Sequence, residues 1–201
     1  MFDVLIIGGG ASGMSCALII GSALEKSFAK DKKAGIIMHQ KASHMQSALF
    51  NNVLGIQPGT HGDTVLKSGQ EQLTNLYPLL QQIENEKVTE ISRQEGFFVV
   101  TTNKTVYHAK TIVVATGYAQ PFTIKGLEQY LTPHQMAKPE KNRIQLKNNL
   151  HVVAKNLYVA GSLAGWRSQF AIACGSGAQV ATDILTLWND GNHTKVHDKK
   201  L

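Results

Sequence analysis

The chain has 201 residues, of which 43% are apolar and 17% are charged, and its formal net charge is +6. This length and composition fit one folded domain with a single sizeable core, and they argue against two full domains or a disordered chain. The Lys and Arg residues are scattered along the sequence, so the positive charge predicts no nucleic-acid site. It would suit an anionic dinucleotide or an acidic protein partner.

The sequence carries no pattern typical of a secreted, membrane or metal-binding protein. Its two cysteines, Cys16 and Cys174, form no Cys-x-x-Cys pair, which excludes a disulfide framework, a zinc cluster and an adjacent redox dithiol. The N-terminus opens with Phe2-Asp3 instead of a basic region, and no apolar run has the length of a membrane span. We therefore expect a cytoplasmic protein that binds neither membrane nor metal.

The first forty residues predict the opening of a dinucleotide-binding fold. Residues 2–7 form a short apolar run that stops at glycines, which is typical of a buried parallel strand. The apolar spacing then predicts a helix from residue 11 to about residue 29, followed by a strand at 35–38. The order strand, glycine turn, helix and strand is that of a Rossmann-type unit.

The rest of the chain is expected to complete one α/β domain over residues 1–190. A segment at 118–150 has no convincing periodicity and is interpreted as a connection, and residues 191–201 are expected to be a flexible tail. The remaining predicted elements are a helix at 63–80, a β-meander at 88–91, 97–102 and 105–108, strands at 110–115, 143–146 and 157–160, and a closing helix at 169–188.

The glycine turn predicts a pyrophosphate site. Gly8 permits the tight turn, Gly10 lets the backbone approach a phosphate, and Gly13 lets the helix lie close to the strand. The backbone N–H groups of Ala11 and Ser12, at the positive end of the helix dipole, would face the phosphates.

The end of the second predicted strand departs from the usual dinucleotide-binding pattern. Such folds place an acidic residue there to bind the ribose hydroxyls, whereas this strand ends in Met38-His39-Gln40. His39 and Gln40 could supply neutral hydrogen bonds in place of the acid, or they could be a solvated loop end. Both interpretations remain open from the sequence.

Two later segments resemble the second and third FAD signatures of the thioredoxin reductase-like flavoproteins. They are Ala115-Thr116-Gly117 after a buried strand, and Val159-Ala160-Gly161-Ser162 followed by Gln169 and Gly175-Ser176-Gly177-Ala178. Asn52-Val53-Leu54-Gly55 resembles the flavin-side loop of the same family. The resemblance covers nearly all of residues 2–188, although the family's Asp and Arg of the third signature are replaced by Ser162 and Ser168.

The resemblance implies a Rossmann-like, three-layer FAD-binding domain with a central parallel sheet and a β-meander. Val88 would contact adenine, Ser162 the ribityl chain, and Asn52 one face of the flavin. The full set of implied FAD contacts is Gly8, Gly10, Ala11, Ser12, Gly13, Asn52, Val88, Ala115, Thr116, Gly117, Gly161, Ser162, Gln169 and Phe170, with His39 and Gln40 as the ribose candidates. Loss of the acid at Ser162 predicts weaker FAD binding, because a charge-assisted hydrogen bond is lost.

The family carries an NADPH domain, with its own glycine turn and a Cys-x-x-Cys pair, between the second and third signatures. Here only residues 118–156 separate Gly117 from Leu157. We therefore expect a flavoprotein oxidoreductase that receives electrons from free NAD(P)H or a partner reductase, and that is not a disulfide reductase. The alternatives are a non-catalytic FAD module and a degenerate Rossmann interaction protein. The surface near residues 118–150 could serve as a docking or homodimer face.

Two single residues are weak catalytic candidates. His44 lies in the loop that the resemblance places near the flavin, where it could donate a proton. Cys174 precedes Gly175 near the start of the last predicted helix, where a helix dipole could lower the pKa of its thiol, but core packing is the favoured interpretation.

Overall fold

The central strand β1 (Phe2–Ile7) is apolar on both faces, which suits a position inside a sheet covered on both sides. The computed structural model describes residues 1–39, 45–118, 121–194 and 196. In it β1 pairs in parallel with β2 (Ala34–Met38) on one side and with β8 (Val106–Val114) on the other. The parallel set continues to β5 (Gln81–Glu84) beyond β2 and to β12 (Leu157–Val159) beyond β8.

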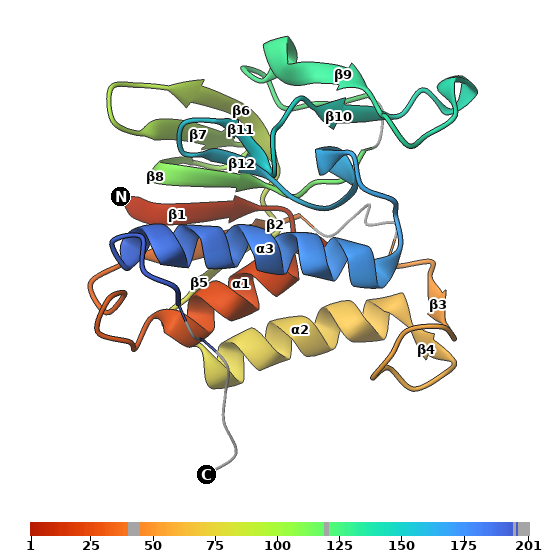
Figure 1. Ribbon diagram of the computed structural model, residues 1–201, viewed down its shortest axis with the longest axis horizontal. Helices are drawn as coiled ribbons and strands as arrows, with labels where there is room; N and C mark the ends of the chain where they lie inside the picture. The colour runs from red at the N-terminus through yellow and green to blue at the C-terminus, as the bar shows by residue number, and fades with distance from the viewer. Residues whose placement is uncertain (40–44, 119–120, 195, 197–201) are drawn as a thin grey trace.

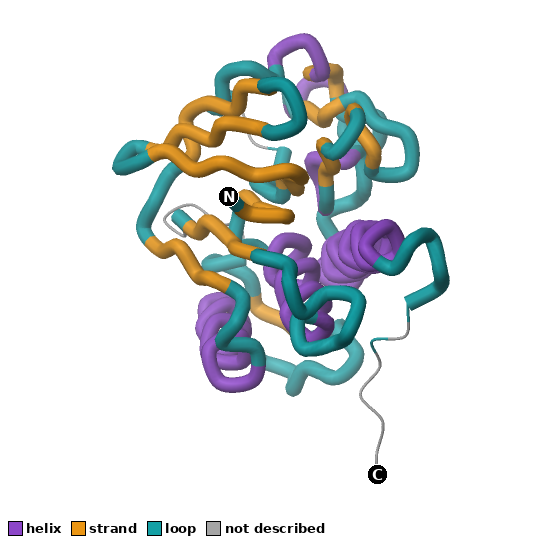
Figure 2. The backbone as a smooth tube through the Cα atoms, turned by 90° about the vertical axis from the view of Figure 1, so that its left-hand side faces the viewer, coloured by secondary structure: helices purple, strands orange, loops and turns teal. Residues whose placement is uncertain are grey.

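Helices cover one face of this sheet and a meander covers the other. Figure 1 shows α1 (Ala11–Ala23), α2 (Gly62–Leu76) and α3 (Phe170–Trp188) on one side, and β6 (Val88–Arg93) and β7 (Phe98–Thr102) on the other; Figure 2 shows the same layers from the side. Two apolar clusters fill the spaces, one between the sheet and the helices and one beneath the meander. The expected Rossmann-like three-layer fold with a β-meander is confirmed.

The remaining elements are short. A two-strand hairpin of β3 (Leu49–Phe50) and β4 (Thr60–His61) precedes α2, and β11 (Val152–Ala154) pairs antiparallel with β12 at the sheet edge. A second antiparallel pair and three 3₁₀ turns complete the chain. They are β9 (Leu131–Pro133), β10 (Ile144–Leu146), η1 (Glu128–Tyr130), η2 (Pro139–Lys141) and η3 (Gly161–Ala164).

Several predicted boundaries were wrong. The first helix ends at Ala23 instead of near residue 29, and the second ends at Leu76, because the chain turns and then forms strand β5. The last meander strand and the following parallel strand are one continuous strand, β8, whose Ala109 pairs with both Phe98 and Phe2. In the predicted connection at 118–150, β10 has a partner strand, β9, that the local pattern did not reveal.

The end of the chain lies partly within the described residues. Thr194 is buried and Val196 packs against the cluster between the helices and the sheet, so this part of the expected tail contacts the core. Within the described residues, α3 is the only helix long and apolar enough to cross a membrane, yet its buried residues Val180 and Ile184 belong to the core cluster that it shares with α1.

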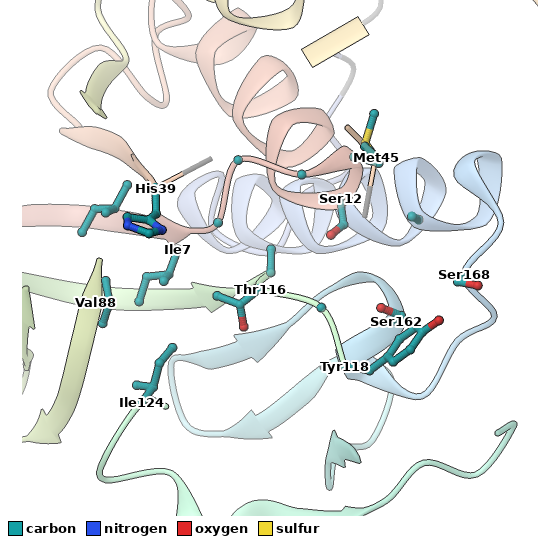
Figure 3. Close-up of a pocket in the computed structure, with 18 of the residues that line it drawn as sticks. Ile7, Ser12, His39, Met45, Val88, Thr116, Tyr118, Ile124, Ser162 and Ser168 are labelled. Carbon is teal, nitrogen blue, oxygen red and sulfur yellow. The ribbon is translucent and has the colours of Figure 1, made fainter. Parts of the chain in front are cut away.

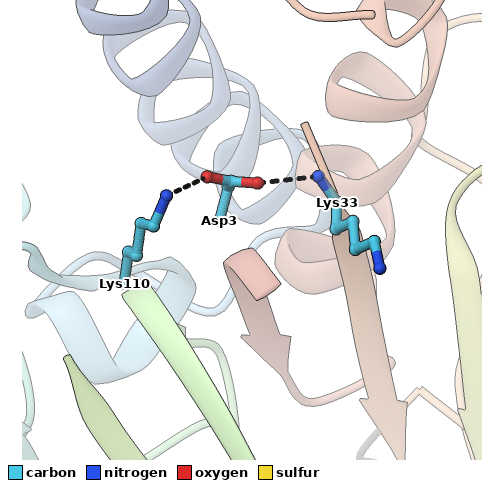
Figure 4. A network of polar contacts seen from close by, with 3 residues as sticks. All are labelled: Asp3, Lys33 and Lys110. Carbon is cyan, nitrogen blue, oxygen red and sulfur yellow. Dashed lines mark hydrogen bonds and ion pairs between the residues drawn. The ribbon is translucent and has the colours of Figure 1, made fainter. Parts of the chain in front are cut away.

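Asp3 joins three segments at the start of β1. Its carboxylate oxygen Oδ1 accepts a hydrogen bond from Lys110 Nζ of β8 at 2.9 Å, and Oδ2 accepts one from the backbone N–H of Lys33 at 2.9 Å (Figure 4). Burial raises the pKa of Asp3, but the Lys33 hydrogen bond and the Lys110 ammonium together outweigh burial and hold the pKa below its ordinary value.

Candidate cofactor-binding site

A cavity of about 680 Å³ opens at the carboxyl ends of the parallel strands. Strands β2 and β8 lie on opposite sides of β1, so the cavity stands where the strand order reverses, which is the usual ligand site of such sheets. Its volume is typical of a small-molecule site. Figure 3 shows an elongated site, with His39 and Val88 at one end, Ser12 in the middle, and Ser162 and Ser168 at the other.

The glycine turn holds β1, β8 and α1 close together beside the cavity. Gly8 has a φ of +113°, and a Cβ on it would stand 2.5 Å from the carbonyl oxygen of Ala115. A Cβ on Gly13 would overlap the carbonyl oxygen of Gly8. Gly13 does not line the cavity, so its observed task is to bring the helix onto the strand.

The start of α1 presents unsatisfied donors to the cavity. Gly10 caps the helix without a side-chain hydrogen bond, and the N–H groups of a first helical turn have no partner within the helix. Ser12 is 6% exposed and lines the cavity, and its hydroxyl has no hydrogen bond to another described residue. These donors and the helix dipole make an anion site at this point.

Three segments far apart in sequence meet at Ser12. Gly161 opens η3 with a φ of +74°, and a Cβ on it would lie 2.5 Å from Ser12 Oγ. A Cβ on Gly177 of α3 would overlap the carbonyl oxygen of Ser12. Ser176 Oγ accepts a hydrogen bond of 2.7 Å from the N–H of Gly161. Gly161 and Gly177, both of the third signature, therefore let η3 and α3 pack directly on the anion site, and Ser162 lines the cavity beside it.

The other end of the cavity contains an acidic residue, Glu86, that the sequence did not indicate. Glu86 is buried and lines the cavity with Val88. Its carboxylate accepts hydrogen bonds from Thr102 Oγ1 at 2.7 Å and from the hydroxyl of Tyr107 at 3.0 Å. Burial, and then the bond to Glu86 and its negative charge, raise the pKa of Tyr107. The two hydroxyls come from the meander, so local sequence carried no signal for this arrangement.

The end beyond Ser162 is lined by aromatic rings and by the start of α3. The rings of Phe50 and Phe170 have centroids 4.8 Å apart, and Ser168 and Ala173 also line the cavity. Gln169 caps α3 by accepting a hydrogen bond from the N–H of Ala171 at 3.3 Å, and it does not line the cavity.

Comparison with known proteins gives a family match over part of the chain and a fold. A model of the family "Pyridine nucleotide-disulphide oxidoreductase" matches residues 71–156. A ferredoxin–NADP reductase of Levilactobacillus brevis is 30% identical over 131 residues, covering 63% of this chain and 38% of that protein. A ferredoxin–NADP reductase 1 of Bacillus thuringiensis is 26% identical over 228 residues, covering 98% of this chain and 62% of that protein. The chain thus spans less than two thirds of these curated relatives.

The solved structures agree on the fold. A thioredoxin reductase from Gloeobacter violaceus superposes with a TM-score of 0.71 at 14% identity, covering 100% of this chain and 98% of that chain. A protein from Bacillus anthracis named "Putative Thioredoxin Reductase TrxB" superposes with a TM-score of 0.69 at 14% identity, covering 94% of this chain and 99% of that chain. The sequence matches and the shared fold support the resemblance to the thioredoxin reductase-like FAD oxidoreductases. The resemblance drawn from its signatures is confirmed.

FAD is the cofactor of these thioredoxin reductase-like oxidoreductases, and the residues present fit it. The uncapped start of α1 and the hydroxyl of Ser12 suit a pyrophosphate in the middle of an elongated cavity. The hydrogen-bonding groups of His39 and Glu86 at one end, and the aromatic rings of Phe50 and Phe170 at the other, suit the adenosine and flavin ends.

The structure brings most of the residues predicted to contact FAD to one cavity. Those that line it are Gly8, Gly10, Ala11, Ser12, His39, Val88, Ala115, Thr116, Gly117, Ser162 and Phe170. Gly13, Gly161 and Gln169 lie behind the lining, and Asn52 is exposed and does not line the cavity. Gln40 and His44 lie outside the described residues.

Cys174 does not line the cavity either. Burial raises the pKa of its thiol, and a hydrogen bond with Ser15 offsets this only in part. Cys174 was a catalytic candidate because a helix dipole could lower the pKa of its thiol. In the structure the pKa of this thiol is raised by burial instead.

Sequence reasoning missed three further parts of the lining. The first is Glu86 and Lys87, directly before Val88. The second is Tyr118 and the stretch Pro121, Phe122, Thr123 and Ile124, which follows the second signature. The third is Met45, Ala48 and Phe50. The second group could have been found from its position, since it continues the chain that leaves the sheet at Gly117.

Proposed function

We propose that this chain binds FAD in the cavity and exchanges electrons with a separate donor and acceptor. The adenosine would lie at the end with His39, Glu86 and Val88, the pyrophosphate over Ser12, and the flavin beyond Ser162. The observation that carries the proposal is the uncapped start of α1 in the middle of an elongated cavity, where Ser12 lines the cavity and its hydroxyl bonds to no other described residue.

The start of α3 supports a redox role for the flavin end. Phe170 and Ala173 of its first turns line the cavity, and no acidic residue stands in that first turn. The positive end of the helix dipole therefore favours negative charge there. Bound FAD supplies reversible hydride and single-electron chemistry, and the protein's part is to hold it and to adjust its potential through such nearby charge.

An external electron donor is proposed because residues 118–156, between the second and third signatures, contain no second glycine turn of the Gly-x-Gly-x-x-Gly type. Free NAD(P)H is one candidate, and a small redox protein such as a ferredoxin is the other, in keeping with the names of the relatives. The net charge of +6 favours encounter with either, since both are anionic.

The cysteines support the proposal that the chain is not a disulfide reductase. The sequence has only Cys16 and Cys174. Cys16 is fully buried, and burial raises its pKa to about 12. Burial also raises the pKa of Cys174. Thiol–disulfide exchange needs a thiolate, so neither residue suits it near neutral pH.

The test starts from the absorbance spectrum of the purified protein and titration of the apoprotein with FAD. We expect a flavin spectrum that is lost, or a Kd that rises about 3- to 10-fold, in Ser12→Ala, because one hydrogen bond disappears. A colourless protein that does not bind added FAD would refute the proposal. The remaining interpretation would then be a degenerate Rossmann domain that acts as an interaction protein.

Anaerobic addition of NADH, NADPH or a reduced ferredoxin then separates the enzyme from a non-catalytic module. Bleaching followed by turnover with a dye supports the oxidoreductase. Reduction by dithionite alone supports the module, and turnover with a disulfide substrate would contradict the proposal. The cytoplasmic location and the homodimer, both expected from the sequence, remain predictions.

A further inference from the structure

Residues 131–148, here called the arm, comprise β9, η2, β10 and the residues between and after them, and the arm holds the turn η3 from outside. Three of its side chains bond to backbone carbonyls of that turn or of Gly165, the residue that follows it. His134 Nε2 lies 3.0 Å from the oxygen of Ser162, Asn148 Nδ2 lies 3.1 Å from that of Ala164, and Gln135 Nε2 lies 3.2 Å from that of Gly165.

The direction of the His134 bond follows from its other ring nitrogen. The backbone N–H of Met136 donates to Nδ1 at 3.1 Å, so Nδ1 carries no proton and Nε2–H donates to Ser162. The ring is buried and stands edge-on to Tyr118, with centroids 5.4 Å apart, and Tyr118 lines the cavity. His134 is thereby fixed between two parts of the site.

The arm packs closely against the residue that follows the turn, Gly165. This residue has a φ of +90°, and a Cβ on it would stand 2.6 Å from the side-chain amides of both Gln135 and Gln145. Gln145 Oε1 in turn accepts the N–H of Gln135 at 2.8 Å. On the opposite side, Ser176 of α3 takes the N–H of Gly161. The turn that presents Ser162 to the cavity is therefore held from both sides.

We propose that His134 and Asn148 are positioning residues for FAD, which hold the Ser162 turn in its binding conformation before the cofactor arrives. The inference rests on the proposed function. A turn ordered in advance loses less conformational entropy on binding, so the affinity for FAD depends on these two side chains although neither His134 nor Asn148 lines the cavity.

The experiment compares His134→Ala and Asn148→Ala with a matched control, Arg93→Ala. Arg93 Nη2 makes the same kind of bond, to the carbonyl oxygen of Lys155 at 2.6 Å, and does not line the cavity. Each apoprotein is titrated with FAD by quenching of flavin fluorescence. Its melting temperature without FAD and the visible circular dichroism of the bound flavin are also recorded.

We expect the Kd for FAD to rise about 3- to 10-fold in His134→Ala and Asn148→Ala, and to stay within about 2-fold of wild type in Arg93→Ala. His134→Gln keeps an N–H donor of similar reach and should restore most of the affinity. The visible circular dichroism should change in His134→Ala and return in His134→Gln, which a loss of global stability alone would not produce.

Unchanged affinities in His134→Ala and Asn148→Ala, with a wild-type protein that binds FAD, would overturn this inference and leave the proposed function standing. An equal loss in Arg93→Ala would also overturn it. Wild-type protein that does not bind FAD would overturn both. If His134→Ala does not fold, the variant at the half-buried Asn148 is judged by the same criteria.

Discussion

Replacement of Gly177 by Ala tests the interlock between α3 and the start of α1. A Cβ there would overlap the carbonyl oxygen of Ser12 and would stand 2.7 Å from its carbonyl carbon and 3.0 Å from its Cα. These are backbone atoms and cannot rotate away, so α3 must move off α1 or Ser12 must shift. Because Ser12 lines the cavity, we expect both stability and FAD affinity to fall.

Gly175 is the matched control, two residues earlier in the same helix. A Cβ on Gly175 would meet nothing within 4 Å. Both substitutions gain the helix propensity of Ala over Gly, about 0.5–1 kcal/mol. Only Gly177→Ala adds the cost of overpacking, about 1–3 kcal/mol. The two variants should therefore differ by about 1–3 kcal/mol, with Gly175→Ala at or above wild type.

The assay is urea unfolding of the two apoproteins followed by titration with FAD. With a urea m-value of about 2 kcal/mol/M, a difference of about 2 kcal/mol separates the unfolding midpoints by about 1 M. The FAD affinity should fall in Gly177→Ala and stay at the wild-type value in Gly175→Ala. Equal midpoints for the two variants, or unchanged FAD binding in a destabilised Gly177→Ala, would refute the reasoning.

Three further predictions concern charge. Asp3→Asn should lower the free energy of unfolding by about 1 kcal/mol at pH 7. The folded-state pKa of Asp3 lies below its ordinary value, so the difference in stability from wild type should shrink as the pH falls from the ordinary pKa through the folded-state pKa. A difference in stability that does not change with pH would contradict the assignment. Ser162→Asp should tighten FAD binding by about 10-fold if a ribityl hydroxyl lies beside it, as fluorescence titration would show, whereas weaker binding would place the phosphates there instead. Cys174 should react with iodoacetamide at pH 7.5 much more slowly in the folded protein than in urea, and a rate equal to that of the unfolded chain would show that burial does not raise its pKa.

Local sequence patterns predicted the parts of the site that depend on backbone shape. Gly8, Gly10 and Gly13 follow a buried strand in a spacing that only a tight strand-to-helix turn requires, so the anion site could be expected from a few consecutive residues. Edge elements were harder to predict. Strand β5 has the sequence Gln-Gln-Ile-Glu and gains its place by pairing with β2, which no local pattern reveals.

The sequence by itself determined the fold class and the place of the glycine turn, because strand period, helix period and glycine spacing act over short distances along the chain. FAD as the cofactor came from the resemblance of the later signatures to the thioredoxin reductase-like flavoproteins. The tertiary structure alone decided which distant groups complete the site. Glu86 is oriented by hydroxyls of the meander, and the Ser162 turn is held by His134 of the arm and Ser176 of α3. Such contacts join segments whose separation along the chain carries no signal, so only packing brings them together.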